Sequence, residues 1–118
     1  MTIKRVLVVD DDPSVRIQLQ LYLETLGLAV ETAEDGQEAL SKLEQIGYDA
    51  VVTDYSMPVV DGLAVLQHIQ KTHPALPVVL MTGDRSHWIV ARALALGAWA
   101  CLFKPFHPRD LGQALKWW

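Results

Sequence analysis

The sequence predicts an α/β domain in which a parallel sheet carries helices on both faces. Three observations support this: runs of aliphatic residues recur along the chain, a helical pattern follows each run, and glycine or proline marks the boundaries. Strands that alternate with helices pair in parallel through right-handed crossovers. With 118 residues, 51% of them hydrophobic and 20% charged, the chain is sufficient for one domain with one core.

The first strand is predicted at 3–9, where Val and Leu dominate as in a strand buried on both faces. Pro13 then suits the first turn of a helix. Apolar residues at helical spacing continue this helix as far as Gly27. A short second strand is predicted at 28–32.

The second helix is predicted to begin at a capping box, because Asp35 is followed three residues later by Glu38. It extends to Gly47, and the third strand follows at 48–53. After a loop, apolar residues at helical spacing predict the third helix over 62–72.

The last two units complete the alternation. The fourth strand is predicted at 77–81, and Ser86 is predicted to cap a helix that stops at Gly97. The fifth strand is predicted at 98–103, and Pro108 begins a last helix that reaches the chain end.

Reactive side chains gather where the predicted strands end. Asp10 and Asp11 follow the first strand, Asp54 the third, Thr82 the fourth and Lys104 the fifth. The carboxyl ends of parallel strands meet at one edge, where such sheets bind ligands. Like charges about 4 Å apart repel by on the order of 4 kcal/mol at an effective dielectric constant near 20, so a hard cation such as Mg²⁺ is expected among them. Lys104 and Thr82 would then face an anion such as a phosphoryl group.

Four motifs at these strand ends, taken together, resemble one family. They are VVDD (8–11), TDYSMPVVDG (53–62), MTG (81–83) and FKPF (103–106). In this order and spacing they resemble the receiver domain of two-component response regulators, the CheY-like superfamily. The resemblance covers residues 1–118 as a single receiver domain, either by itself or as an N-terminal or excised part of a longer chain. It implies a flavodoxin-like (βα)5 three-layer sandwich with strand order 2-1-3-4-5.

The resemblance also implies the chemistry. Asp54 would be the phosphoacceptor and would receive its phosphoryl group from a sensor histidine kinase or a histidine phosphotransfer protein. Asp11 would ligate Mg²⁺, or Mn²⁺ as the alternative ion, together with Asp54 itself. Asp10 would help to bind the ion, partly through water, and the backbone carbonyl of Ser56 would complete the protein ligands. Asp12 falls outside the pattern and is predicted to be a helix N-cap.

Further roles follow from the same resemblance. Lys104 and Thr82 would hold phosphoryl oxygens, the Gly83 N–H would donate to another, and the bond before Pro105 would be cis. Thr82 would act as a switch residue. Its movement would bias the face made by the predicted helix 86–97, the strand 98–103 and the last helix, where a homodimer would also form. The domain would be a switch that assists its own phosphorylation and dephosphorylation, not a turnover enzyme.

Each of these residues also has a plain structural interpretation. Asp54 could be a surface acid, Lys104 a solvated lysine and Thr82 an ordinary strand residue. Asp84 and Ser56 would tune the lifetime of the phosphoryl group or serve only as loop residues. The histidines lack ligand spacing, and none is predicted to be catalytic: His68, His73, His87 and His107.

Two other function classes compete with the switch. A phosphatase of the haloacid-dehalogenase type would use Asp10 as its nucleophile, but the sequence lacks that family's late acidic pair and cap domain. A flavodoxin-type FMN carrier needs an anion-binding loop after the first strand, where this chain has Asp10, Asp11 and Asp12.

The sequence departs from the family at position 101. Most receivers have Tyr or Phe three residues before the lysine, and this switch position is Cys101 here. A buried thiol that packs as a small apolar group is favoured over a redox role. The part that this aromatic ring plays in the switch could pass to Trp88 or Trp99. For the terminal pair, Trp117 and Trp118, three roles remain open: covering the last helix, packing on a dimer partner, or marking where a longer chain was cut.

The composition indicates which partners and which cellular compartment are compatible with this chain. The net charge of −4 argues against nucleic-acid binding by this domain. Cys101 is the only cysteine, so no internal disulfide can form and a reducing compartment fits. The apolar start runs into acids too early for a signal peptide, and no run could span a bilayer. We therefore expect a cytoplasmic protein without membrane contact, whose cognate kinase and effector the sequence does not identify.

Overall fold

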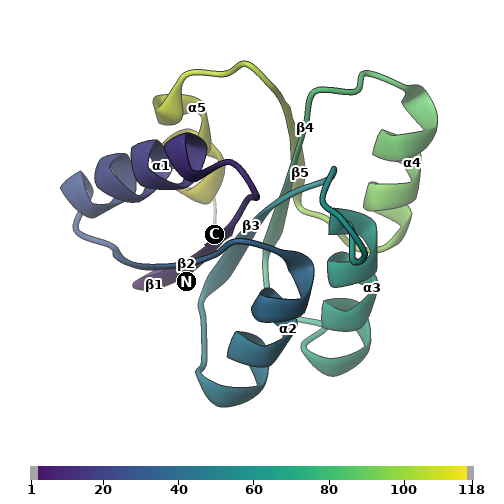
Figure 1. Cartoon of the computed structure of the whole chain (residues 1–118), viewed down its shortest axis with the longest axis horizontal. Helices are drawn as coiled ribbons and strands as arrows, with labels where there is room; N and C mark the ends of the chain where they lie inside the picture. Colours follow the sequence, from purple (N-terminus) through teal and green to yellow (C-terminus); the bar gives the residue numbers. More distant parts are fainter. Residues whose placement is uncertain (1–2, 117–118) are drawn as a thin grey trace.

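Strands and helices alternate through residues 3–116, the part of the chain that the computed structural model describes (Figure 1). The strands are β1 (Arg5–Val9), β2 (Ala29–Ala33), β3 (Ala50–Asp54), β4 (Val78–Thr82) and β5 (Ala100–Phe103). The helices are α1 (Pro13–Thr25), α2 (Gly36–Gln45), α3 (Gly62–Thr72), α4 (His87–Ala95) and α5 (Pro108–Lys116). The predicted roles of Trp117 and Trp118 lie outside the described residues.

The strands form one parallel sheet in the order β2-β1-β3-β4-β5. β1 pairs with β2 on one side and with β3 on the other, so the strand order reverses at β1. Crossovers on the two sides of this point cover opposite faces, which leaves a crevice beyond the carboxyl ends of β1 and β3. The predicted fold class and strand order are confirmed.

The sheet is buried on both faces because neighbouring residues of each central strand serve different cores. Val6 and Val8 belong to the core beneath α1 and α5, whereas Leu7 and Val9 belong to the core beneath α2, α3 and α4. All four side chains are completely buried. Burial of such a side chain contributes roughly 1.5–3 kcal/mol, so the aliphatic run of β1 anchors both layers and holds its carboxyl end in place.

The strands begin one to two residues later than the sequence pattern predicts. At β1 the reason is Asp49, whose Oδ2 accepts hydrogen bonds from the backbone N–H groups of Lys4 and Arg5, each at 2.9 Å. A side chain thus satisfies donors that a longer ladder would have used. These bonds also hold the pKa of Asp49 below its usual range, with the charges of Lys4 and Arg5 adding to the effect.

Carboxylates begin three of the helices. Asp12, Asp35 and Asp61 each accept a hydrogen bond from a backbone N–H in the first turn of the helix that follows. The predicted caps at Asp12 and Asp35 are therefore confirmed. Ser86 stands at the N-cap position of α4, but its side chain makes no capping bond, so that prediction was wrong in its chemistry. Its hydroxyl donates to the Asp84 carboxylate instead, at 2.6 Å.

The loop between β3 and α3 packs against two glycines. A Cβ atom on Gly62 would overlap the carbonyl oxygen of Asp54, and one on Gly36 would overlap the carbonyl oxygen of Val60. The Gly62 N–H also donates to the Tyr55 carbonyl at 2.8 Å. These close approaches fix the backbone that leaves Asp54.

Candidate functional site

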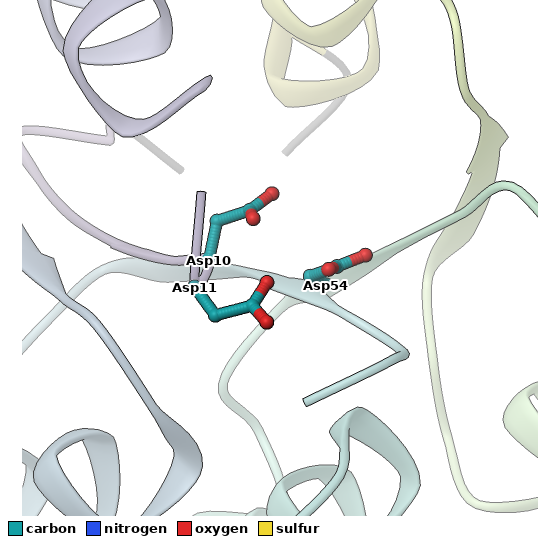
Figure 2. Close-up of side chains that lie close together, drawn as sticks. All are labelled: Asp10, Asp11 and Asp54. Atoms are coloured by element: carbon teal, nitrogen blue, oxygen red, sulfur yellow. The ribbon is translucent and has the colours of Figure 1, made fainter. Parts of the chain in front are cut away.

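Three carboxylates surround one small space at the switch point of the sheet (Figure 2). Asp10 and Asp11 follow β1, and Asp54 is the last residue of β3. Each offers an oxygen, and these oxygens lie within 4.8 Å of one another. Asp10 is completely buried, Asp54 is 6% exposed, and Asp11 is exposed. Because β1 and β3 are adjacent parallel strands, residues far apart in the sequence meet at their ends.

Lys104 brings a positive charge to this cluster from the end of β5. Its Nζ lies 2.6 Å from Oδ2 of Asp10 and 3.3 Å from Oδ1 of Asp54. Its backbone N–H donates to the Thr82 carbonyl at 2.8 Å, which continues the ladder beyond β5. The peptide bond between Lys104 and Pro105 is cis. One ammonium group therefore contacts two carboxylates that would otherwise be buried without a counter-charge.

Burial and like charge perturb the titration of Asp54. Loss of solvent around the carboxyl group and the negative charge of Asp10 raise the pKa of Asp54 to about 6, although Lys104 acts in the opposite direction. Burial alone would lower the pKa of Lys104. The hydrogen bond to Asp10 and the charge of Asp54 outweigh that effect and raise it above its ordinary value. At neutral pH the structure therefore holds an ionised Asp54 beside a firmly protonated lysine.

Asp10 is fixed by several bonds. Its Oδ1 accepts from the Asp12 N–H at 2.9 Å, its N–H donates to the Ala33 carbonyl at 3.1 Å, and its carbonyl accepts from Nη1 of Arg16 at 2.7 Å. Arg16 was not among the site residues predicted from the sequence. The only signal for it was a basic residue in the first turn of the helix that follows the acids.

Asp12 turns away from the cluster. Its Oδ1 accepts from both the hydroxyl and the N–H of Ser14, each at 2.9 Å, and these bonds lower the pKa of Asp12. The third acid of the run therefore serves α1, while the first two serve the site.

Thr82 ends β4 at the same edge, and its side chain is buried. Its hydroxyl accepts from the Asp84 N–H at 2.9 Å and donates to the Asp84 carbonyl at 3.3 Å. The Asp84 carboxylate in turn accepts from the N–H and hydroxyl of Ser86, which lower the pKa of Asp84. The structure thus engages the predicted switch hydroxyl with its own loop, away from Asp54.

The remaining predicted residues lie around the site without joining the carboxylate cluster. Ser56 and Gly83 are exposed on the loops after β3 and β4. Cys101 is half-buried in β5, where it packs against the core beneath α2, α3 and α4, and burial raises the pKa of its thiol. These surroundings are those of a packing residue.

The carboxylate cluster fits a divalent cation. Mg²⁺ prefers hard oxygen ligands, and the three carboxylates offer oxygens within 4.8 Å of one another. The three hard oxygen donors come from two backbone segments, and the donor residue Asp11 is exposed. This arrangement leaves room for the waters that Mg²⁺ retains. Asp10 already uses Oδ1 and Oδ2 within the protein, so Asp11 and Asp54 are the ligands best placed for direct contact.

Comparison with known proteins identifies the family. The model of the response regulator receiver domain matches residues 6–116. The chain belongs to this family. Alkaline phosphatase synthesis transcriptional regulatory protein PhoP of Bacillus subtilis is 36% identical over 113 residues, which are 96% of this chain and 47% of that protein. The chain thus spans about half or less of the length of the curated relatives it matches first.

Solved receiver structures have the same fold. The chemotaxis protein CheY4 of Vibrio cholerae has a TM-score of 0.91 and 32% identity, and the match covers 98% of both chains. TrrA of Thermotoga maritima, solved in complex with Mg(2+)-BeF, has a TM-score of 0.87 and 35% identity over 97% of both chains. The chain is thus a receiver domain of the response-regulator type, a signalling switch, and the dehalogenase-type alternative is not favoured.

Two general properties of receiver domains bear on this chain: metal binding and interaction with kinases. Receiver domains bind Mg²⁺ at an aspartate cluster and interact with histidine kinases, and this chain has such a cluster in Asp10, Asp11 and Asp54. Within residues 3–116 the structure has no helix of the length and hydrophobicity that crossing a bilayer requires.

Proposed function

We propose that Asp54 accepts a phosphoryl group from a phosphohistidine, in a site completed by Mg²⁺. The observation that supports this most directly is the buried Asp54 carboxylate, held 3.3 Å from the Lys104 ammonium and within 4.8 Å of carboxylate oxygens of Asp10 and Asp11. A nucleophile, a counter-charge and a set of metal ligands thereby lie together at one edge of the sheet.

The chemistry needs little beyond positioning and neutralisation of charge. An Asp54 oxygen forms a bond to phosphorus while the bond between phosphorus and the donor imidazole nitrogen breaks, and the imidazole keeps the electron pair. Asp54 must be ionised to attack, and a pKa of about 6 leaves it mostly ionised at neutral pH. Bound Mg²⁺, or Mn²⁺ as the alternative ion, would reduce repulsion between the carboxylates and the incoming phosphoryl oxygens.

Other residues would hold the group once it is transferred. The Lys104 ammonium has three donors, so it can keep its bond to Asp10 and also bind a phosphoryl oxygen. The N–H of Gly83 would donate to another oxygen, and the carbonyl of Ser56 would ligate the ion. The exposed side chains of Ser56 and Asp84 would tune how readily water attacks the acyl phosphate.

The output would follow from Thr82. If its hydroxyl turns to a phosphoryl oxygen, its two bonds to Asp84 break, and the loop before α4 is released. The face made by α4, β5 and α5 would change, including its capacity to form a homodimer. The donor would be a sensor histidine kinase or a histidine phosphotransfer protein. This domain would have no nucleic-acid contact of its own.

Labelling with acetyl phosphate and Mg²⁺ tests this function. Intact-mass spectrometry should show one added phosphoryl group per chain, and Asp54→Asn should abolish it. Glu44→Gln, an exposed acid on α2, is the matched control and should label normally. EDTA should suppress labelling, and sustained labelling in EDTA would contradict the role of the metal. If Asp10→Asn removed labelling while Asp54→Asn retained it, the phosphatase alternative would be favoured instead.

A further inference from the structure

An aromatic contact links the residue after Asp54 to α4. The rings of Tyr55 and Trp88 meet edge to face, with centroids 6.3 Å apart and an interplanar angle of 82°. Tyr55 is half-buried against the core, and its N–H donates to the Met81 carbonyl at 2.7 Å. Trp88 lies in the first turn of α4 and is 59% exposed. A fixed ring beside the acceptor thus contacts a largely solvated ring on the helix.

The residue before α4 uses its side chain in the preceding loop. Ser86 does not cap the helix, because its N–H and hydroxyl both donate to Oδ1 of Asp84. Asp84 is joined in turn to the Thr82 hydroxyl. A continuous set of hydrogen bonds therefore runs from Thr82 at the site edge to Ser86, two residues before Trp88.

Trp88 and Trp99, the two candidates for the missing aromatic ring, lie at opposite ends of the strands. The backbone N–H of Trp99 donates to the carbonyl of Val78, which is the first residue of β4. It therefore lies at the amino ends of the strands, opposite to Asp54. Trp88 follows the carboxyl end of β4, and Figure 1 shows α4 beginning at that edge of the sheet.

We propose that the Tyr55–Trp88 contact couples occupancy of Asp54 to the position of α4, in place of the ring that residue 101 lacks. This inference rests on the proposed phosphoacceptor role of Asp54. When Thr82 leaves Asp84, the loop 83–86 shifts and the Trp88 ring moves relative to Tyr55, which stays anchored through its backbone and the core. The contact acts as the lever between the site and the surface of α4.

NMR of the ¹⁵N-labelled chain with Mg²⁺ and beryllium fluoride, a phosphoryl mimic, tests the coupling. The indole N–H signal of Trp88, assigned through Trp88→Phe, should shift on addition of the mimic, whereas that of Trp99 should stay in place. Tyr55→Leu should reduce the response of the α4 amide signals at least twofold, whereas Tyr55→Phe, which keeps the ring, should preserve it. Labelling by acetyl phosphate should stay within twofold of the unmodified chain in both variants.

The outcomes separate the coupling from the function on which it rests. Fluorine NMR reports bound beryllium fluoride independently of any tryptophan. A bound signal without a shift at Trp88, or an undiminished α4 response in Tyr55→Leu, overturns the coupling and leaves the function of Asp54 intact. An absent bound signal refutes both. Trp88→Leu alters an exposed side chain and should also lose the α4 response, so the test remains decisive if Tyr55→Leu fails to fold.

Discussion

The substitution Asp54→Asn removes a negative charge from a cluster of three carboxylates, two of which are buried and share the Lys104 ammonium group. The pKa of Asp54 is about 6 in the folded chain, against an ordinary value of 3.8. A difference of about two pKa units corresponds to roughly 3 kcal/mol of destabilisation when the carboxylate is ionised in the folded state. The asparagine variant avoids this cost, and Lys104 keeps Asp10 as its partner. We therefore expect Asp54→Asn to be more stable than the unmodified chain at pH 7 in EDTA.

The pH dependence has a definite sign. Well below pH 3.8, the ordinary pKa of the carboxyl group, Asp54 is protonated in both the folded and unfolded states, so it contributes no difference. As the pH rises from about 4 to about 6, the unfolded state ionises more readily than the folded state, and the unmodified chain loses stability. Above that window the loss is constant. The advantage of Asp54→Asn should therefore be small near pH 4, about 0.5 kcal/mol, and complete near pH 7.

Thermal unfolding followed by circular dichroism in EDTA measures this effect. A difference of about 3 kcal/mol corresponds to a Tm difference on the order of 10 °C for a domain of this size. Saturating Mg²⁺ should stabilise the unmodified chain and reduce the difference, because the ion binds only the folded site. Equal or lower stability of Asp54→Asn at pH 7, or an advantage that persists unchanged to pH 4, would refute the electrostatic reasoning. The control Glu44→Gln retains Asp54, so its unfolding curves should follow those of the unmodified chain.

Three further substitutions or reactions test the surroundings of the site. Val59 has a φ of 67°, which strains a β-branched residue, and its side chain is 99% exposed. Val59→Asn should therefore raise the free energy of unfolding by about 1 kcal/mol in urea titrations, and a lower free energy of unfolding would contradict backbone strain at this position. Gly62→Ala should destabilise the fold by about 2 kcal/mol or more because of overlap with the Asp54 carbonyl, whereas Gly47→Ala, which meets no atom within 4 Å, should change Tm little. The Cys101 thiol, whose pKa is raised by burial, should react with iodoacetamide more slowly at pH 8 in the folded chain than in urea; equal rates would contradict that environment.

The sequence could predict the meeting of Asp10, Asp11, Asp54 and Lys104 because it depends on the strand order and the parallel sheet. Once aliphatic runs alternate with helices, the residue after each run is bound to reach the same edge. The strand starts were less predictable, since they depend on which donors a side chain satisfies. Asp49, 44 residues after Arg5, ends the ladder at β1 through such a bond, and no local pattern announces it.

Side-chain direction was the part of the site that the sequence could not supply. The hydroxyl of Thr82 could rotate toward Asp54 or toward Asp84, and only the loop geometry decides for Asp84. The same holds for Ser86, a good capping residue whose hydroxyl is used elsewhere. The Tyr55–Trp88 contact joins the residue after β3 to the first turn of α4, and no sequence motif links the two positions. Position in the fold was therefore predictable, whereas the choice among nearby hydrogen-bond partners was not.

The instability attributed to Asp54 and its expected reactivity have one physical origin. The cluster contains three carboxylates and a single ammonium group. The nearby charges of Asp12 and Arg16 are opposite in sign and therefore cancel; Asp12 is bonded to Ser14 and Arg16 to a backbone carbonyl. The cluster thus carries an excess of about two negative charges, which a divalent ion would neutralise and a monovalent ion would not. Burial of the carboxyl group and this excess of negative charge together raise the pKa of Asp54. Neutralising it by Asp54→Asn gains stability and removes the nucleophile, whereas neutralising it with Mg²⁺ gains stability and retains the nucleophile for the incoming phosphoryl group.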